Sequence, residues 1–332
     1  MRHERPAGTG ETEAIDVGNG GAQAFEHRPV MLGEVVSLLH PVPAGLVVDA
    51  TVGGGGHAAA ILRDRPDLRL LGIDRDPAAA AAAGAALAAF GDRARIVQGG
   101  FEEVADIVGS ERSEGIVGIL FDLGVSSAQL DSRVRGFSYW ADDAPLDMRM
   151  DSAQALTAAT VVNEYSESDL AALIARNGEE RYARRIAARI VAARPLRTTG
   201  ELVAAIKAAI PAPARRRGGH PARRTFQAVR MEVNRELPSL TAGLDESVHL
   251  LAPEGRMLVL AYHSLEDRAV KERFAEWART EEPAPVGTKL PRRARIPLVR
   301  LLTRRPLRPS AEEVAENPRS ESARLRGIER LR

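Results

Sequence analysis

With 332 residues, 44% of them apolar, the chain is long enough for one large domain or two linked smaller ones. It contains no cysteine, which excludes disulfide bonds, thiolate metal centres and any mechanism with a cysteine nucleophile. The formal net charge is only +1, so binding to a polyanion has to depend on where the cations cluster. No run approaches the roughly 18 apolar residues of a membrane span and no signal peptide is visible, so we expect a soluble, cytoplasmic protein without membrane association.

The first part of the chain has the pattern of an α/β fold. Residues 1–26 carry few apolar side chains and show no period, which is typical of a disordered leader. Beyond them, short apolar runs alternate with helical windows, which predicts parallel strands joined by helices. The expected strands are 45–50, 68–74, 94–98 and 116–123, with helices at 57–63 and 77–90.

A helical segment interrupts this alternation. Residues 140–222 contain no clear strand pattern, but they contain helical windows at 167–177, 181–193 and 199–210. The α/β pattern then resumes with helices at 226–237 and 240–251 and a strand at 256–262. We therefore predict a doubly wound, Rossmann-like sheet formed by residues 27–139 and 223–332 and interrupted by an inserted helical domain, 140–222. The second part ends in a basic C-terminal tail whose pattern predicts no definite structure.

A glycine-rich loop indicates a nucleotide-like cofactor. Four consecutive glycines, Gly53 to Gly56, follow an apolar strand that ends in Asp49, and a helix follows them. Such glycines allow a ligand to approach the backbone at a helix N-terminus, although a tight turn would explain them too. Asp74 ends the next strand 19 residues after Gly55, where an acidic side chain can accept hydrogen bonds from ribose hydroxyls.

The loop favours S-adenosylmethionine over a nicotinamide cofactor. Contiguous glycines do not fit the G-x-G-x-x-G spacing of dinucleotide sites, and Asp49 suits the ammonium group of a methionine. Phe101, after the third strand, is a candidate for stacking on adenine, with a core position as the alternative. A nicotinamide-dependent oxidoreductase stays open as the alternative enzyme.

The fourth strand carries the candidate chemistry. Asp122 lies at its carboxyl end, where open α/β sheets bind ligands, and Ser126 follows in the next turn. An exocyclic base amine is a poor nucleophile, so an enzyme that methylates it needs acceptors for the N–H groups. Asp122 can supply one, or it can simply cap the turn. The absence of cysteine excludes methylation at cytosine C5, which requires a thiolate.

His263 follows the strand at 256–262 onto the same edge of the sheet. It is a candidate general base, with a structural or RNA-binding role as the alternative. The sequence Ser264-Leu-Glu-Asp267 also fits a helix-capping box. No cluster of histidine and carboxylate residues has metal-site spacing, so we expect no metal.

Basic stretches indicate a nucleic-acid partner. Residues 215–235 contain seven arginines and 289–308 contain eight cations without an acid, and both runs can follow phosphates or form ordinary solvated faces. A target base has to be unstacked to react, and aromatic side chains such as Tyr139 are candidate stacking platforms. The candidate RNA contacts are Tyr139, Arg149, Arg217, Arg224, Arg230 and Arg268.

Eight motifs occur in order along the chain: Thr51-Val-Gly-Gly-Gly-Gly-His57, Ile73-Asp-Arg-Asp76, Asp122-Leu-Gly-Val-Ser-Ser127, Leu146-Asp-Met-Arg-Met-Asp151, Gly178-Glu-Glu-Arg181, Arg224-Thr-Phe-Gln-Ala-Val-Arg230, His263-Ser-Leu-Glu-Asp-Arg268 and Glu316-Asn-Pro-Arg319. From about His27 to Arg326, the chain thereby resembles the bacterial 16S ribosomal RNA cytosine-N4 methyltransferases, the RsmH or MraW family. Gly54 departs from the family, in which an arginine is common at this position.

The resemblance implies a class I methyltransferase sheet and methylation of a cytidine in the decoding region of the small ribosomal subunit. It also implies that S-adenosylmethionine is bound by Gly55, Gly56, His57, Asp74, Phe101, Asp122 and Gln129. A non-catalytic RNA-binding assembly protein with the same fold is the alternative outside enzymes. The sequence leaves the oligomeric state open, with a homodimer among the compatible arrangements.

Overall fold

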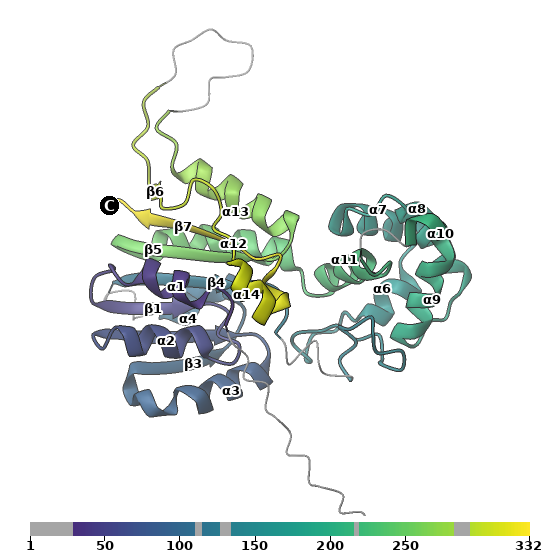
Figure 1. Ribbon diagram of the computed structural model, residues 1–332, viewed down its shortest axis with the longest axis horizontal. Coiled ribbons are helices and arrows are strands. Elements are labelled where there is room, and N and C mark those ends of the chain that lie inside the picture. The colour runs from purple at the N-terminus through teal and green to yellow at the C-terminus, as the bar shows by residue number, and fades with distance from the viewer. Residues whose placement is uncertain (1–28, 110–114, 127–133, 216–218, 282–292) are drawn as a thin grey trace, which may run out of the picture.

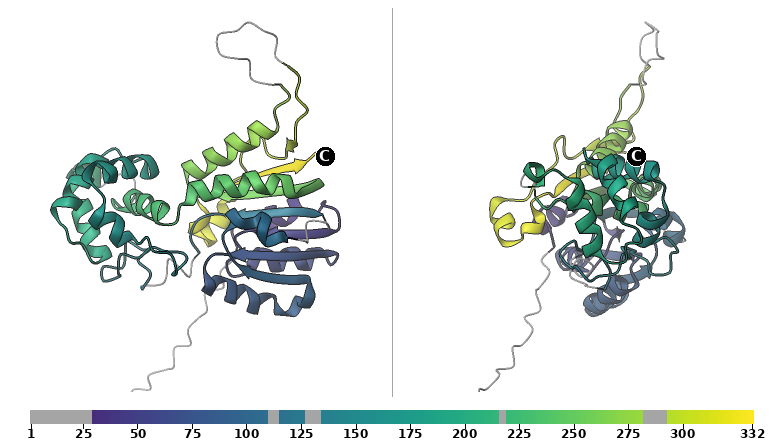
Figure 2. Two further views of the ribbon diagram at one scale, coloured as in Figure 1. Left: turned by 180° about the vertical axis from the view of Figure 1, so that it is seen from behind. Right: turned by 90° about the vertical axis from the view of Figure 1, so that its right-hand side faces the viewer.

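The computed structural model describes residues 29–109, 115–126, 134–215, 219–281 and 293–332. They form two bodies side by side, an α/β sheet with helices on both faces and a smaller cluster of helices beyond one end of its strands (Figures 1 and 2). The predicted leader, Gln129 and Arg217 lie outside the described residues. In the described part of the chain, no helix is long and apolar enough to cross a membrane.

The strands of the described residues form one seven-stranded sheet in the order β3-β2-β1-β4-β5-β7-β6. The five strands from β3 to β5 are parallel, whereas β7 runs antiparallel to both of its neighbours. Their bounds are β1 Gly45–Asp49, β2 Leu68–Asp74, β3 Ala94–Gln98, β4 Ile116–Asp122, β5 Leu251–Ala261, β6 Val299–Leu301 and β7 Arg324–Arg330. The predicted doubly wound, Rossmann-like sheet is confirmed, and the strand order reverses between β1 and β4.

Helices cover both faces of the sheet because its strands are apolar on both sides. In β1, Val47 packs with the helices of one face, and Leu46 and Val48 pack with those of the other. The first face carries α1 Leu32–Leu39, α2 Gly56–Asp64 and α3 Pro77–Leu87, which the 3₁₀ helix η1 Ala88–Arg93 extends. The second face carries α4 Val104–Val108, α12 Glu236–Leu250 and α13 Ser264–Trp277, with the 3₁₀ helix η2 Phe101–Glu103 before α4.

The C-terminal segment is part of the sheet rather than a tail, which corrects our expectation. Strand β7 inserts between β5 and β6, and Leu325 and Ile328 are fully buried there. The short helices α14 Ala311–Glu316 and η4 Pro318–Ser320 precede it. Several basic residues of this segment pair with carboxylates: Arg300 lies 2.7 Å from Glu329, and Arg295 lies 2.8 Å from Glu276. Some of the basic residues in this segment therefore form ion pairs within the fold.

The smaller body has its own core of buried apolar residues from the helices α6 Ala158–Glu164, α7 Glu167–Gly178, α8 Ala183–Ala192, α9 Thr199–Ala209 and α11 Arg223–Val233. The short α10 Ala212–Arg215 follows α9. Helix α11 packs against α7, and its Phe226, Val229 and Val233 belong to this core. Phe137, ahead of the expected start at 140, is buried in it too. The helical body therefore extends on both sides of 140–222, and α11, which we had assigned to the sheet, belongs to it.

The chain leaves the helical body at Asn234 and Arg235. Arg235 has a φ of 51°, so the backbone changes direction between the end of α11 and the start of α12 at Glu236. We had expected one helix over 226–237 and a second over 240–251. Pro238 instead lies in the first turn of α12, where the missing N–H has no helical partner to lose.

The contact between α7 and α11 predicts an effect on stability. A Cβ atom at Gly178 would lie 2.6 Å from the carbonyl oxygen of Arg224, so Gly178→Ala should destabilise the protein by about 1–3 kcal/mol. Gly84→Ala in α3 is the control, because nothing lies within 4 Å of its added Cβ, and it should stabilise by up to ~1 kcal/mol. Urea denaturation measures both. Equal stability of Gly178→Ala and the wild type would contradict this close helix contact.

Candidate functional site

Three strand ends bring three carboxylates to one edge of the sheet. Asp49, Asp74 and Asp122 end β1, β2 and β4, which are neighbours around the point where the strand order reverses. Open α/β sheets bind ligands at this place because the loops on either side diverge. The structure thus assembles three of the predicted site residues, which are far apart in the sequence.

Asp49 is a buried carboxylate in the neighbourhood of other carboxylates. Its side chain is 1% exposed, and burial raises its pKa to about 8. The backbone N–H of Thr51 donates to it at 3.2 Å and partly offsets this rise, whereas the charges of Asp122 and Asp74 add to it. An ammonium group placed beside Asp49 would supply the missing cation and stabilise the charged form.

Asp74 fixes the glycine loop. Its carboxylate accepts the backbone N–H of Gly53 at 3.0 Å and that of Asp76 at 2.9 Å. Burial raises its pKa, although these two hydrogen bonds act in the opposite direction. The predicted ribose ligand is therefore a half-buried acceptor whose orientation is set by the loops on both sides.

The glycine loop leads directly into α2. Gly55 has a φ of 80° and precedes the first helical residue without a side-chain cap, so the helix N-terminus is open toward the edge of the sheet. At Gly56 an added Cβ would collide with the ring of Pro29. His57, 6% exposed, places Nε2 2.9 Å from the carbonyl oxygen of Val30 and Nδ1 3.5 Å from Asp122. A carbonyl only accepts, so Nε2 carries a proton.

Asp122 is held by two groups from neighbouring strands. Its backbone N–H donates to the Thr51 hydroxyl at 2.6 Å, and the Tyr262 hydroxyl donates to its carboxylate at 2.7 Å. Burial and the charge of Asp122 raise the pKa of Tyr262 well above its usual value, so Tyr262 stays protonated and continues to donate. The Asp122 side chain is 24% exposed and thus accessible from the edge of the sheet.

Tyr262 is a functional candidate that the sequence analysis missed. It directly follows β5 and precedes the His263 motif, so its position after a strand neighbouring β4 was available as a signal. Ser126 lies four residues beyond Asp122 and is half-buried. Its catalytic role stays a prediction.

Phe101 packs within the sheet body while keeping part of its surface exposed. Its ring meets the edge of Phe121 at 5.6 Å between centroids, and the Arg75 guanidinium lies 5.6 Å from its centre. Gly243 of α12 allows this approach, because a Cβ there would lie 2.9 Å from the ring. These contacts show that Phe101 has a packing role in the sheet body. Its stacking on adenine stays a prediction.

His263 caps α13, and this geometry argues against the role of general base. Its Nδ1 accepts the backbone N–H of Glu266 at 3.3 Å, so in a neutral ring the proton is on Nε2, which lies 3.1 Å from the Glu266 carboxylate. The buried Glu266 in turn accepts the backbone N–H of His263. The capping box begins at His263 and not, as expected, at Ser264.

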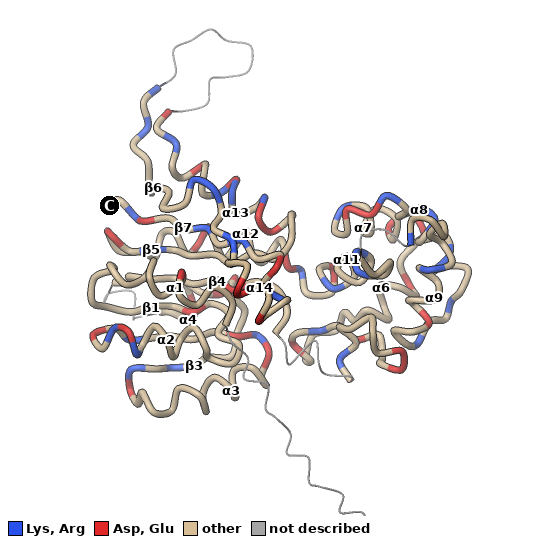
Figure 3. The backbone as a smooth tube through the Cα atoms, viewed as in Figure 1, with Lys and Arg blue, Asp and Glu red and all other residues tan. Residues whose placement is uncertain are grey.

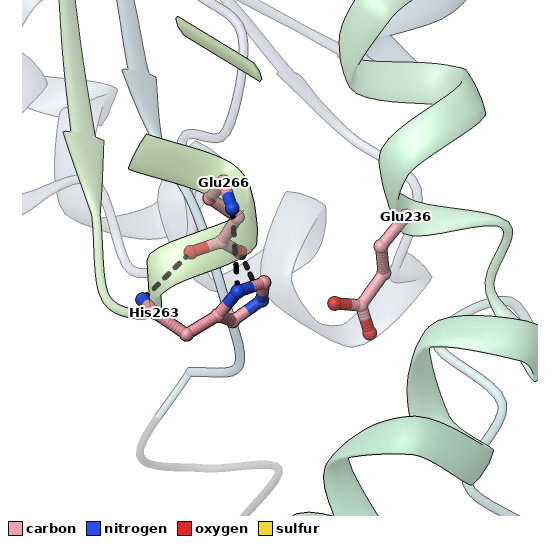
Figure 4. A group of neighbouring side chains, drawn as sticks. All are labelled: Glu236, His263 and Glu266. Atoms are coloured by element: carbon pink, nitrogen blue, oxygen red, sulfur yellow. Dashed lines mark hydrogen bonds and ion pairs between the residues drawn. The ribbon is translucent and has the colours of Figure 1, made fainter. Parts of the chain in front are cut away.

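Among the described residues, Glu236, His263 and Glu266 are the group whose potential metal ligands lie within 4.8 Å of one another (Figure 4). The capping role leaves His263 without a lone pair for a metal, because Nε2 is the protonated atom. Glu236 accepts hydrogen bonds from two nitrogens of Arg230, Nε at 2.8 Å and Nη2 at 2.9 Å. Protein groups thus already pair these side chains, and we keep the prediction that no metal binds here.

Two of the arginines predicted to bind RNA are used inside the fold. Arg149 binds Asp147 through Nε and Nη2 and the carbonyls of Ser152 and Gln154 through Nη1. Arg230 is largely buried against Glu236. Their donors are committed to neighbouring protein groups, so the structure does not support them as phosphate ligands.

Arg224 and Arg268 are exposed between the two bodies. Arg224 donates one N–H to the Glu179 carbonyl, and Arg268 pairs with the Glu179 carboxylate at 3.0 Å. A cleft of about 640 Å³ lies here, lined from the helical body by Arg181, Arg223 and Arg224 and from the sheet by Tyr262 and Arg324. Acidic and basic positions alternate over both bodies, so this local group of arginines is more informative than the total charge (Figure 3).

Aromatic rings lie at the helical side of this cleft. Tyr139 stacks on His220 with 4.6 Å between centroids and 6° between planes, and Trp140 lies 4.7 Å from the same His220. Trp140 is 74% exposed, whereas Phe137 is buried. The sequence analysis named Tyr139 but missed His220, which lines the cleft.

The buried state of Asp49 predicts a pH-dependent stability. In the folded protein its pKa is about 8, against an ordinary 3.8, so the unfolded chain releases the proton first as the pH rises. Stability without ligand should fall between pH 4 and pH 8, by up to ~1.4 kcal/mol per pH unit. Asp49→Asn should remove this dependence and raise Tm near pH 7.5, as thermal unfolding will show. The exposed Asp92→Asn is the control, and parallel pH profiles of Asp49→Asn and wild type would refute the assignment.

Comparisons with known proteins identify the relatives of this chain. Residues 24–331 match the model of the MraW methylase family. The chain is 52% identical over 314 residues to Ribosomal RNA small subunit methyltransferase H of Symbiobacterium thermophilum, covering 93% of this chain and 98% of that one. Its identity to the protein of the same name from Kocuria rhizophila is 49% over 312 residues, covering 92% and 94%. The crystal structure of an rRNA methylase from Streptococcus thermophilus matches with a TM-score of 0.42 at 12% identity, covering 93% and 100%. Since the family model spans nearly the whole chain and the relatives share about half of its residues over their length, the chain belongs to the MraW methylase family.

Proposed function

We propose that this protein transfers the methyl group of S-adenosylmethionine to N4 of a cytidine in 16S ribosomal RNA, in the decoding region of the small ribosomal subunit. The observation that carries the proposal is Asp122, held beside the cofactor loop by Thr51 and by Tyr262, which also lines the cleft between the two bodies. The names of the relatives support ribosomal RNA of the small subunit as the substrate, and the motif resemblance supports the cytidine N4 atom. Its place of action would be the cytoplasm, with the ribosome.

The edge of the sheet fits S-adenosylmethionine. The buried Asp49, whose charged neighbours are carboxylates, suits the methionine ammonium, and the open N-terminus of α2 suits the methionine carboxylate. Asp74 suits the ribose hydroxyls, and Phe101 lies where it can contact adenine. When bound, the cofactor supplies an electrophilic methyl group on a sulfonium.

The protein's contribution to the reaction is to hold the target amine. The lone pair of an exocyclic amine is delocalised into the base, and a carboxylate that accepts its N–H favours the pyramidal, nucleophilic form. Asp122 supplies this acceptor, and Tyr262 orients it by donating to one of its oxygens. Because Tyr262 does not ionise near neutral pH, Asp122 keeps its charge-assisted bond throughout the reaction.

The cleft supplies the path for the RNA. The base has to leave its stack to reach Asp122, and the Tyr139–His220 stack with the exposed Trp140 offers flat surfaces beside this path. Arg223 and Arg224 lie on the same wall and can contact phosphates.

Asp122→Asn should abolish most of the methyl transfer while leaving RNA binding within about threefold of the wild type. Loss of one preorganised electrostatic contact in a transition state lowers kcat by about 10²–10³-fold. Tyr262→Phe, which keeps the carboxylate but removes its orienting donor, should cost about tenfold. The assay is transfer of labelled methyl to small subunits that lack the modification, with mass spectrometry of the nucleosides, and Asp92→Asn is the control.

N4-methylcytidine formed by the wild type alone would establish reaction and acceptor atom. Methyl groups on another atom, RNA or protein would overturn the proposed substrate. Full activity of Asp122→Asn would overturn its role. A biological effect that persists in a variant without methyl transfer would favour the non-catalytic RNA-binding protein.

Replacing Arg223 and Arg224 together by alanine should weaken binding to small subunits at every salt concentration and reduce the salt dependence. Each lost phosphate contact removes about 0.7–0.9 from the slope of log K against log salt. The affinity for S-adenosylhomocysteine should not change. Arg63→Ala, on α2, is the matched control, and an unchanged slope in the double variant would exclude these arginines as phosphate contacts.

A further inference from the structure

One arginine connects the cofactor edge to the helical body. Arg135 lies where the chain passes from the sheet to the helices, and its Nη1 donates to the Asp76 carboxylate at 2.6 Å. Its Nη2 donates to the backbone carbonyls of Arg149 and Met150, at 2.6 and 2.9 Å. A single planar guanidinium thus binds both bodies, a geometry that a lysine cannot reproduce.

Asp76 joins this contact to the predicted ribose ligand. Its backbone N–H donates to Asp74 at 2.9 Å, and its carboxylate caps α3 by accepting the Ala78 N–H at 3.0 Å. Its side chain is only 3% exposed, so the Arg135 charge compensates a buried anion. Asp74, Asp76 and Arg135 form a continuous chain of hydrogen bonds from the cofactor edge to residues 149 and 150.

The second connection between the two bodies, at Asn234, binds the same segment, residues 148–150. The Asn234 side chain donates to the Met148 carbonyl and accepts the Met150 N–H, each at 2.8 Å. The Asn234 carbonyl accepts Arg75 Nη1 at 2.8 Å, and Arg75 also binds Glu102 beside Phe101. Residues 148–150 are therefore bound on one side by Arg135, which also binds Asp76 of the sheet body, and on the other by Asn234 at the end of α11. Both connections between the sheet and the helical body, at Arg135 and at Asn234, are therefore hydrogen-bonded to the loops that we assign to the cofactor.

We propose that Arg135 is a positioning residue that fixes the helical body relative to the methyl donor and makes binding of cofactor and RNA cooperative. This inference rests on the proposed function, because it requires a cofactor at Asp74 and RNA on the helical body. Hydroxyls bound to Asp74 order the loop with Asp76, which orders Arg135 and the segment 148–150. The first ligand to bind bears the entropy cost of ordering this contact. The second ligand then binds to a contact that is already ordered, so its binding is more favourable.

The first experiment measures binding, not turnover. Calorimetry gives the Kd of S-adenosylhomocysteine for the full-length protein, and filter binding gives the Kd of unmodified small subunits with and without S-adenosylhomocysteine. For the wild type we expect the cofactor product to tighten subunit binding about fivefold or more. In Arg135→Ala this coupling should fall below about twofold, and Asp76→Asn with Arg135→Ala should lose no more than Arg135→Ala alone.

Turnover provides a second readout. Displacement of the target base by about 1 Å lowers kcat roughly 100-fold, so Arg135→Ala should lose kcat while its Kd for S-adenosylhomocysteine changes less than threefold. Arg93→Ala is the matched control, because Arg93 also binds backbone carbonyls, those of Leu62, Arg65 and Leu68, but within the sheet body alone. It should lower Tm without changing the coupling.

The outcomes separate the two proposals. Wild-type protein that does not bind S-adenosylhomocysteine would overturn the proposed function itself. Normal binding of both ligands, with coupling and kcat in Arg135→Ala equal to those of the wild type or of Arg93→Ala, would overturn the role of Arg135. If Arg135→Ala does not fold, Arg135→Lys retains the charge beside Asp76 but not the fork to two carbonyls, and it should keep stability while losing coupling.

Discussion

The burial of a carboxyl group among other carboxylates, where β1, β2 and β4 end, is the constraint on which the rest of the site depends. Asp49 is held at 1% exposure with other carboxylates as its charged neighbours, and burial raises its pKa to about 8. Such an arrangement costs stability in the empty protein and gains it when a cation binds. The glycine loop, the open start of α2 and the oriented Asp74 surround this charge with backbone donors and a polar acceptor, so the edge of the sheet is prepared for a zwitterionic, ribose-bearing ligand.

Asp122, the proposed catalytic group, is held by the same sheet in a different way. Asp122 keeps a partly exposed carboxylate because Tyr262 and Thr51 hold it from the neighbouring strands. Its exposure suits the proposed contact with a substrate, whereas the burial of Asp49 suits the proposed contact with the cofactor. Two carboxylates at the ends of adjacent strands thus differ in exposure and hydrogen bonding, and this difference underlies the separate roles that we propose for them.

The helical body forms the second wall of the cleft in which we propose that the RNA binds. It stands beyond the strand ends, and the cleft between the bodies reaches Tyr262 directly. A flexible connection would leave the distance from an RNA base to the methyl donor undefined. Arg135, Arg75 and Asn234 instead fix both chain crossings to the loops beside Asp74 and Phe101. The position of the helical body is thereby tied to the residues proposed to contact the cofactor.

The sequence by itself determined the parallel strands, the glycine loop and the acids at the strand ends, because strand periodicity and glycine geometry are local properties. The strand limits of β2 and β3 agree with the expected 68–74 and 94–98. Only the tertiary structure decided the rest: β7 enters the sheet by pairing with distant β5, and α11 joins the helical core through α7. Which arginines are available to a partner was also decided by the tertiary structure. Arg149 and Arg230 pair with groups inside the fold, whereas Arg224 is exposed at the cleft. Partners such as Glu236 for Arg230, or Tyr262 for Asp122, become neighbours only when the chain folds, so no local pattern could have assigned these roles.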